Sequence, residues 1–456
     1  MRTVVKRILR LLGFDRAVTF GILARVWGLF SGPITMVVIA TGLYPAQQGF
    51  YFTFSSLLAL QTFFDLGLMF VIAQFASHEF VNLSWGRNGS LEGEPVALKR
   101  FTDLLCKTVL WFGIAALLMI ALLIPAGIIF FGQKGNVDFQ WRLPWVLAVV
   151  GTALNLFIMP FFAIIMGSGD VVTANKRDLA GALLSSLLCW GVIVLHGGLY
   201  AAFAVNLGVL GISWGYLMTR RPELVKLAWK GLFGAKRRGG EEQSGLSWWS
   251  EIWPMQWRMA VSSGAAYFFF QLFNPVLFHF HGPIVAGQMG MTLTAANALL
   301  AGSMTVVNAK TPEFGKLIAV RDWQGLDRLF FRVIRHALLL VLVGAVVGFI
   351  AIWFLQAQFT IGNRFIPAGE AALLFGTACF QAAAGAFANY LRAHKKEPLM
   401  RMTIIASILQ GAATWYLGKH YGVPGVTAGF FAITAFFVFP YVLFVWKRCR
   451  REWHAC

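Results

Sequence analysis

Two apolar stretches near the start of the chain decide its fold: RAVTFGILARVWGLFSGPITMVVIATG at residues 16–42 and GFYFTFSSLLALQTFFDLGLMFVIAQF at residues 49–75. Each exceeds the ~20 apolar residues that cover the ~30 Å hydrocarbon core of a bilayer when a helix rises 1.5 Å per residue. The connection between them is short. The sequence therefore predicts two adjacent, antiparallel transmembrane helices.

Each predicted helix carries one charged side chain well inside its span, Arg25 in the first and Asp65 in the second. At the helical rise per residue both lie roughly 13 to 15 Å from the same end, so the two could meet. A charge at that depth is costly unless it is paired or faces a wet cavity, which makes both residues functional candidates. The alternative is an Arg25–Asp65 ion pair that only fixes helix packing.

The rest of the chain continues the same pattern. Of its 456 residues, 58% are hydrophobic and only 12% are charged. Long apolar runs divide into about twelve predicted transmembrane helices, whereas a membrane β-barrel would show short alternating segments. The five cysteines are scattered without paired spacing, so neither a disulfide framework nor a metal site is indicated. The predicted class is an all-α polytopic membrane protein.

The net charge of +19 is a topology signal. If the spans alternate, 33 of the 38 Lys and Arg residues fall in loops on one side, which assigns those loops and both termini to the cytoplasm. This distribution argues against nucleic-acid binding. The basic N-terminal segment MRTVVKRILRLLGF is expected to lie on the inner leaflet, and no cleavable signal peptide is evident.

The longest polar connection, about forty residues, divides the predicted helices into two sets of six. We expect an N-terminal lobe at 1–218, a cytoplasmic interfacial linker at 219–257 and a C-terminal lobe at 258–456. The linker opens with RRPELVKLAWKGLFGAKRR, whose apolar and basic residues alternate at helical spacing, as in a helix that lies on a membrane surface.

The second half repeats the first faintly. Aligning Pro33 with Pro275 places Arg16 opposite Arg258, and a second match aligns Gly49 with Gly287. Tyr267 and Ser303 then take the places of Arg25 and Asp65, so the buried charges belong to the first half only. Parallel duplication of six-helix halves is a known transporter plan.

The stretches YPAQQGFYFTF, FFDLGL and SHEF of the first hairpin, and NYLRAHKKEP after the tenth span, resemble the multidrug, oligosaccharidyl-lipid and polysaccharide transporter superfamily. Within it, the chain looks most like the bacterial polysaccharide flippases. The resemblance implies a two-lobed fold with alternating access and a central cationic cavity. It implies passage of an undecaprenyl-pyrophosphate-linked oligosaccharide from the cytoplasmic to the periplasmic leaflet of the bacterial inner membrane, for surface polysaccharide assembly. The implied partners are that lipid-linked oligosaccharide, membrane lipids and other polysaccharide assembly proteins.

Lipid II flippases of the same superfamily use arginines in the first span, and Arg16 and Arg25 are residues of the matching kind; Arg258 is a third candidate. Arginine suits a pyrophosphate because its planar fork matches phosphate oxygens. Asp65 is a candidate for balancing Arg25 or for coupling to a cation such as H⁺ or Na⁺. Pro33 and Pro275 would allow equivalent bends in spans one and seven, which makes them candidate hinges.

Two other functions stay open. A cation-coupled multidrug exporter of the same fold would rely on a buried carboxylate, and Asp65 is the one this chain offers. A membrane polysaccharide polymerase or glycosyltransferase would need carboxylates or histidines in a sizeable external loop, and the predicted external loops are short. His279 and His281 lie two residues apart, which does not place them on one helical face for a metal. We therefore expect no enzyme and no cofactor.

Overall fold

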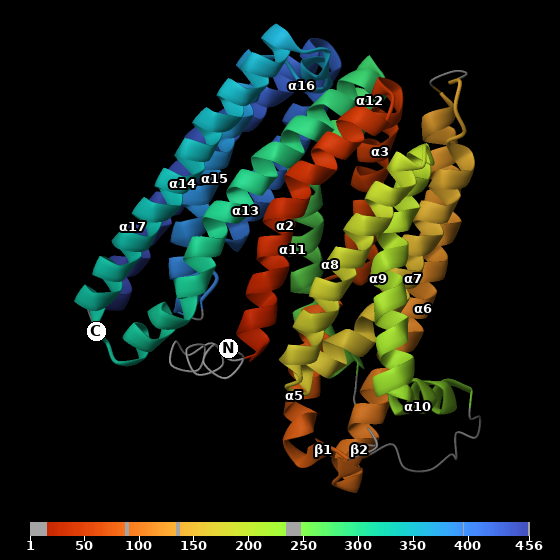
Figure 1. Cartoon of the computed structure of the whole chain (residues 1–456). Helices are drawn as coiled ribbons and strands as arrows, with labels where there is room; N and C mark the ends of the chain where they lie inside the picture. Colours follow the sequence, from red (N-terminus) through yellow and green to blue (C-terminus); the bar gives the residue numbers. More distant parts are fainter. Residues whose placement is uncertain (1–15, 87–90, 134–136, 234–247, 395, 455–456) are drawn as a thin grey trace, which may run out of the picture. The chain divides into compact units, whose positions relative to one another are not determined.

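The computed structural model describes residues 16–86, 91–133, 137–233, 248–394 and 396–454, and helices make up nearly all of them (Figure 1). The predicted all-α class is confirmed. The strands described are β1 (Leu83–Trp85) and β2 (Leu91–Gly93), which pair antiparallel as a small hairpin. The segment MRTVVKRILRLLGF and the middle of the predicted linker, 234–247, lie outside the described residues.

Nine helices among the described residues are long and apolar enough to cross a membrane, or eleven if each of two bent helix pairs counts as one span. The last of the nine, Met400–His454, holds 55 residues, which at 1.5 Å per residue is far longer than a ~30 Å hydrocarbon core. Gly422 interrupts it with a non-helical φ of 61°. This segment is long enough for two crossings, and counting it as two brings the eleven candidate spans to the predicted twelve.

The chain divides into two compact units. Unit 1 contains the described residues up to Ser31 together with Leu58–Gly264, and unit 2 contains Gly32–Leu57 and Ala265–Cys456. The predicted lobes at 1–218 and 258–456 place residues 32–57 and 258–264 in the other half, and unit 1 also contains the predicted linker at 219–257. The structure shows the reason in unit 2: a Cβ on Gly49 would lie 1.8 Å from the carbonyl oxygen of Pro283, so α3 and α13 pack with their backbones almost in contact.

Unit 1 contains the first part of α2 (Arg16–Gly42) and most of α11 (Trp253–Phe270). Between these two helices lie the elements η1 (Ala59–Gln61), α4 (Thr62–Asp65), α5 (Leu68–Glu79), η2 (Phe80–Asn82), α6 (Pro95–Gly132), α7 (Arg142–Gly167), α8 (Val171–Val194), η3 (Gly198–Tyr200), α9 (Ala201–Arg220), α10 (Pro222–Phe233) and η4 (Trp248–Ile252).

The basic ends of the unit 1 helices are joined by polar contacts. The Arg100 guanidinium lies between two carboxylates, 2.8 Å from Glu79 and 2.9 Å from Glu251, and so connects α6 to α5 and η4. Arg221 contacts Asp170 at 3.3 Å and lies 4.0 Å above the ring of Trp85 in the hairpin. These contacts fix the turns at this end of the unit.

The predicted interfacial helix is present as α10. Its apolar face is covered, since Leu224 and Ala228 are buried and α10 packs against α6, whereas Lys226 and Lys230 are exposed. The helical spacing of its apolar residues thus arises from packing on unit 1 as well as from any membrane surface.

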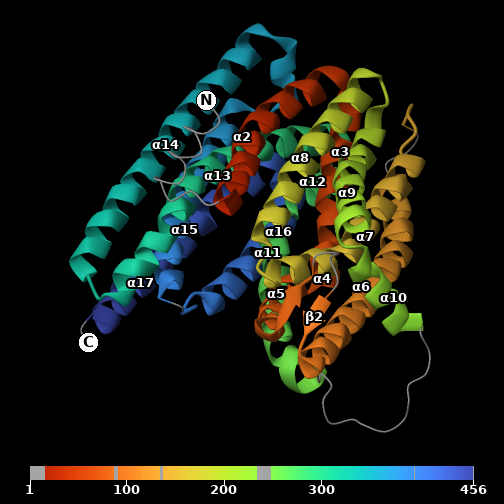
Figure 2. The same ribbon diagram turned by 60° about the horizontal axis from the view of Figure 1, so that its bottom comes forward.

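Unit 2 contains the second part of α2, the last residues of α11 and eight further helical elements besides α3. These are α12 (Phe273–His281), α13 (Pro283–Ala319), α14 (Trp323–Gln358), η5 (Thr360–Arg364), α15 (Ala368–Ala393), α16 (Met400–Ala432), η6 (Ile433–Val438) and α17 (Phe439–His454), with α3 at Pro45–Leu58. Figures 1 and 2 both show α13, α14, α15 and α17 side by side, as their mutual contacts require.

The described end of α17 is fixed within unit 2 by a polar cluster. Arg450 forms an ion pair with Asp327 at the start of α14, and the hydroxyl of Tyr390 in α15 donates to the same carboxylate at 3.1 Å. The ring of His454 stacks on that of Trp323 with 4.3 Å between centroids. Three helices are thereby tied together at one end.

Candidate functional site

Arg25 lies in the part of α2 that belongs to unit 1, and its side chain is exposed. The helix α2 packs against α8: the Trp27 indole N–H donates to Ser186 Oγ at 3.3 Å, and its ring lies 6.1 Å from that of Trp190. A Cβ on Gly21 would meet the Asn175 amide at 3.2 Å. These contacts hold α2 against α8, while the Arg25 side chain stays exposed.

Asp65 lies where the second span is broken. Leu66 and Gly67 have φ values of 52° and 68°, and the helical segments on either side are bent by 41°. The Asp65 carboxylate accepts a hydrogen bond from the backbone N–H of Met69 in the first turn of α5. Its Oδ1 atom is buried without a partner among the described residues. Asp65 therefore caps α5 with one oxygen and keeps the other unused.

Arg25 and Asp65 do not pair with each other. Among the described ranges neither side chain takes part in an ion pair. Helix packing in this part of unit 1 therefore does not depend on an Arg25–Asp65 contact. The two residues remain separate candidates.

The structure brings α11 to the break beside Asp65. A Cβ on Gly67 would lie 2.8 Å from the Cβ of Met259, so the two helices cross closely there. Arg258, the neighbour of Met259, is exposed, and its guanidinium carbon lies 5.7 Å from the centre of the Trp257 ring. Arg16 is the first residue of α2, but its side chain lies outside the described part of the chain. Their role as substrate ligands stays a prediction.

The two candidate hinge prolines occupy different settings. Pro33 is exposed inside an unbroken α2, directly after the point, Ser31 to Gly32, where α2 passes from unit 1 to unit 2. Pro275 is buried in α12, three residues after the interruption that separates α12 from α11. Pro33 thus lies where the chain changes unit and Pro275 lies just after a helix break within unit 2, and their hinge role stays a prediction.

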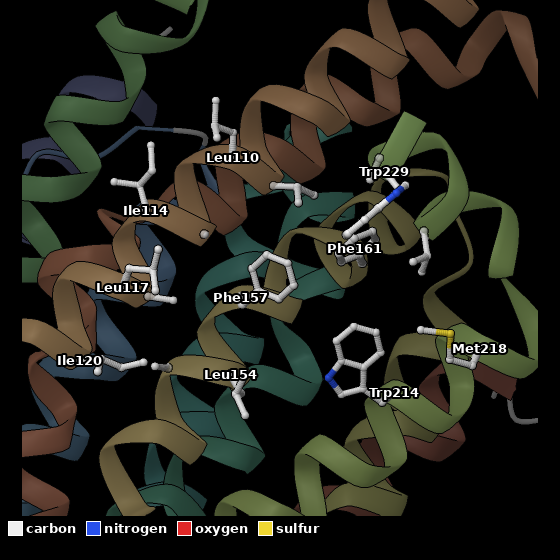
Figure 3. A pocket seen from close by; sticks show the side chains of 16 residues that line it. Leu110, Ile114, Leu117, Ile120, Leu154, Phe157, Phe161, Trp214, Met218 and Trp229 are labelled. Atoms are coloured by element: carbon white, nitrogen blue, oxygen red, sulfur yellow. The ribbon is translucent and has the colours of Figure 1, made fainter. Parts of the chain in front are cut away.

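A large cavity in unit 1 is apolar. It has a volume of about 740 Å³ and lies among α6, α7, α9 and α10, where Figure 3 shows Phe157, Trp214, Trp229 and Leu117 around it. Apart from the indole N–H groups of its two tryptophans, no polar side chain lines it. Such a cavity suits a hydrocarbon chain or an aromatic molecule and offers nothing to a sugar or a diphosphate.

A second cavity of unit 1, about 510 Å³, is basic. It lies between α8 and α9 and is lined by Thr173, Lys176, Arg177, Ala180, Ile212, Tyr216 and Arg220. The sequence reasoning missed this site, because it counted these three basic residues only as evidence of topology. The signal was present in the pairs at 176–177 and 220–221, which end adjacent spans on the same predicted side.

No cluster of three or more metal-ligating side chains occurs within the described residues.

Comparison with known proteins rests on structure alone. No family model matches the sequence, and no curated protein matches it. Solved structures do match: an inward-facing multidrug resistance MATE transporter of the MOP superfamily shares 16% identity at a TM-score of 0.58, covering 92% of this chain and 99% of that one. This chain has the MATE transporter fold.

Two further neighbours agree along nearly their whole length. A MATE structure in the bent conformation gives a TM-score of 0.54 at 14% identity, with 97% of each chain covered. A MOP transporter from Pyrococcus furiosus, described as having a binding pocket of reversed polarity that suggests a different function, gives 0.52 at 14% identity over 96% of each chain. The superfamily suggested by the resemblance is thus matched in fold, while the polysaccharide flippases within it stay a prediction.

Proposed function

We propose that this protein is a flippase that moves an undecaprenyl-pyrophosphate-linked oligosaccharide from the cytoplasmic to the periplasmic leaflet of a bacterial inner membrane by alternating access. The observation that carries the proposal is Arg25, a guanidinium deep within the first span that no carboxylate neutralises among the described residues. A charge at this depth needs an anion or a wet cavity. A diphosphate provides the anion, because arginine binds phosphate oxygens through two parallel hydrogen bonds.

The fold supports a transporter and leaves the cargo to be decided by the side chains. Its structural neighbours include one described as a multidrug resistance transporter and one whose pocket polarity is described as reversed. Among the described residues of the first hairpin, Arg25 forms no ion pair, and the carboxylate of Asp65 already accepts the Met69 N–H with one oxygen. That balance favours an anionic cargo.

The remaining site residues take roles consistent with this cargo. Arg16 and Arg258 extend the positive charge from Arg25 toward the cytoplasmic ends of spans one and seven. The unused oxygen of Asp65 is the place for a coupling H⁺ or Na⁺. Pro33 permits bending in α2, and Pro275 permits bending in α12, which follows the break at the end of α11.

The second candidate is a cation-coupled multidrug exporter, and one observation favours it. The 740 Å³ cavity among α6, α7, α9 and α10 is apolar and lined by aromatic rings, as expected of a site for hydrophobic drugs. It lies apart from the charged residues of α2 in sequence and offers no group that recognises a diphosphate. A membrane polymerase or glycosyltransferase gains no support from the fold.

The test is complementation of a deletion strain with Arg25→Ala, with Arg25→Lys as the charge-preserving control and Lys230→Ala as a control for a cation outside the span. Surface polysaccharide and membrane-bound lipid-linked repeat units are quantified separately, at matched expression. We expect Arg25→Ala to lose surface polysaccharide and accumulate full-length lipid-linked units, while Lys230→Ala behaves as the wild type.

Full glycan display by normally expressed Arg25→Ala would remove the role given to that residue. If deletion of the gene leaves surface polysaccharide intact but lowers resistance to hydrophobic cations, the exporter becomes the better account.

A further inference from the structure

The basic cavity between α8 and α9 has the composition of an anion site. Of the seven residues that line it, three are cationic and none is acidic. Two cations, Lys176 and Arg220, are exposed and form no ion pair among the described residues. Like charges that share one cavity repel each other, and an anion bound between them removes that cost.

The third cation, Arg177, is held in a fixed orientation. Its Nε donates to the buried Ser213 hydroxyl at 2.8 Å, and its guanidinium lies 4.5 Å from the centre of the Phe162 ring. Its Nη1 donates to Asp178 at 2.9 Å, which uses that nitrogen. The third nitrogen, Nη2, has no partner among the described residues. A pre-oriented guanidinium with a free edge loses little entropy when it binds an oxyanion.

Two hydroxyl groups complete the polar wall. Tyr216 in α9 donates to Thr173 Oγ1 in α8 at 3.3 Å, which joins the two helices across the cavity. Since Thr173 accepts this bond, its own hydroxyl hydrogen remains to be donated. The wall therefore offers several donors, and the two carboxylates that contact its residues, Asp170 and Asp178, each form an ion pair with an arginine.

The cavity also adjoins the first span. Lys176 Nζ lies 5.1 Å from the centre of the Phe20 ring on α2. Arg25 follows Phe20 by five residues, which is about 7.5 Å along a helix. The cavity thus lies against the part of α2 that precedes Arg25, although the five-residue spacing puts Phe20 and Arg25 on different faces of the helix.

We propose that the cavity between α8 and α9 binds the phosphate groups of a membrane lipid, with Lys176, Arg177 and Arg220 as the charged ligands. Phosphate oxygens match these donors, and a volume of about 510 Å³ holds more than one phosphate. The lipid is either the diphosphate-linked carrier or an anionic phospholipid. The first source rests on the proposed function, in which the cavity is the loading site on the cytoplasmic side before Arg25.

The test measures binding to the purified, full-length protein in detergent with two probes: farnesyl pyrophosphate, a short isoprenyl diphosphate, and phosphatidylglycerol. The variant Lys176→Gln/Arg220→Gln removes two charges from the cavity. Its matched control, Lys226→Gln/Lys230→Gln, removes two charges from α10, which does not line the cavity. Arg220→Gln alone, at an exposed position, serves if the double variant unfolds.

We expect the cavity variant to bind at least one probe about tenfold more weakly, equivalent to about 1.4 kcal/mol, and the α10 control to match the wild type. Selective loss of farnesyl pyrophosphate identifies the carrier diphosphate as the ligand, and selective loss of phosphatidylglycerol identifies the phospholipid headgroup. Unchanged binding of both probes, or equal weakening by the α10 control, overturns the proposal. Binding is measured here without translocation, so the two proposals can fail separately. If the cavity binds a probe but deletion of the gene leaves surface polysaccharide intact, the proposed function is refuted and the binding site is not.

Discussion

Asp65 has two separable roles in this structure, and a pair of neutral substitutions tests them. The carboxylate caps α5 by accepting the Met69 N–H, and its second oxygen is buried without a partner in the described part of unit 1. Asp65→Asn and Asp65→Ala both remove the charge, but only asparagine keeps an acceptor for the cap. The comparison of the two variants therefore isolates the capping hydrogen bond from the loss of charge.

Loss of a capping acceptor typically costs about 1 kcal/mol. For a cooperative unit of roughly 200 residues this corresponds to about 2–4 °C in the midpoint of thermal unfolding. We expect Asp65→Ala to unfold lower than Asp65→Asn by this margin, measured on purified protein in detergent. Equal midpoints for the two variants would show that the cap contributes nothing.

The coupling role needs the charge itself. We expect Asp65→Asn to fold as well as the wild type but to lose surface polysaccharide in the complementation assay, because an amide cannot exchange H⁺ or balance Na⁺. Full polysaccharide display by Asp65→Asn, at normal expression, would refute coupling through Asp65 and leave it a helix cap only.

Three further predictions concern unit 2. Gly49→Ala places a methyl group against the Pro283 backbone and is expected to lower the free energy of unfolding by more than about 2 kcal/mol. Gly315→Ala, which has open space around it, should be neutral or stabilising. Thermal unfolding of both variants tests this difference. Gln48 is buried and donates to the Gly287 and Arg364 carbonyls at 2.8 and 3.0 Å, so Gln48→Leu should lower stability by about 2–4 kcal/mol, and a midpoint equal to that of the wild type would contradict this account. Burial lowers the pKa of His394 in the folded protein, so the unfolded chain binds the proton more readily. The contribution of His394 to stability should therefore be complete above pH ~6.5 and decline below it. His394→Phe should reduce this pH dependence of the unfolding midpoint.

The number and type of the membrane helices followed from the sequence because hydropathy acts locally. Each span must bury its own backbone hydrogen bonds and match the bilayer with apolar side chains, whatever its neighbours are. The stretches around Arg25 and Asp65, the amphipathic α10 and the split of Met400–His454 into two crossings all follow from composition and length. The structural neighbours then support the superfamily fold that short motifs had suggested.

The tertiary structure decided which side chains meet, because that depends on packing between segments far apart in the chain. Hydropathy places Asp65 in a span, but only the αL residues Leu66 and Gly67 show that the helix breaks directly after it. Gly49 and Gly287 matched as repeat partners in sequence, whereas in space they lie against each other and draw α3 into unit 2.

The basic cavity is the clearest case of this difference. From the sequence, Lys176 and Arg220 are predicted to be ordinary cations of cytoplasmic loops, because membrane topology alone accounts for positive charge at the ends of spans. Their convergence on one cavity arises from the side-by-side packing of α8 and α9, which no local pattern encodes. The sequence by itself determined how many times the chain crosses the membrane and where its charge accumulates, and the tertiary contacts determined which of those charges share a site.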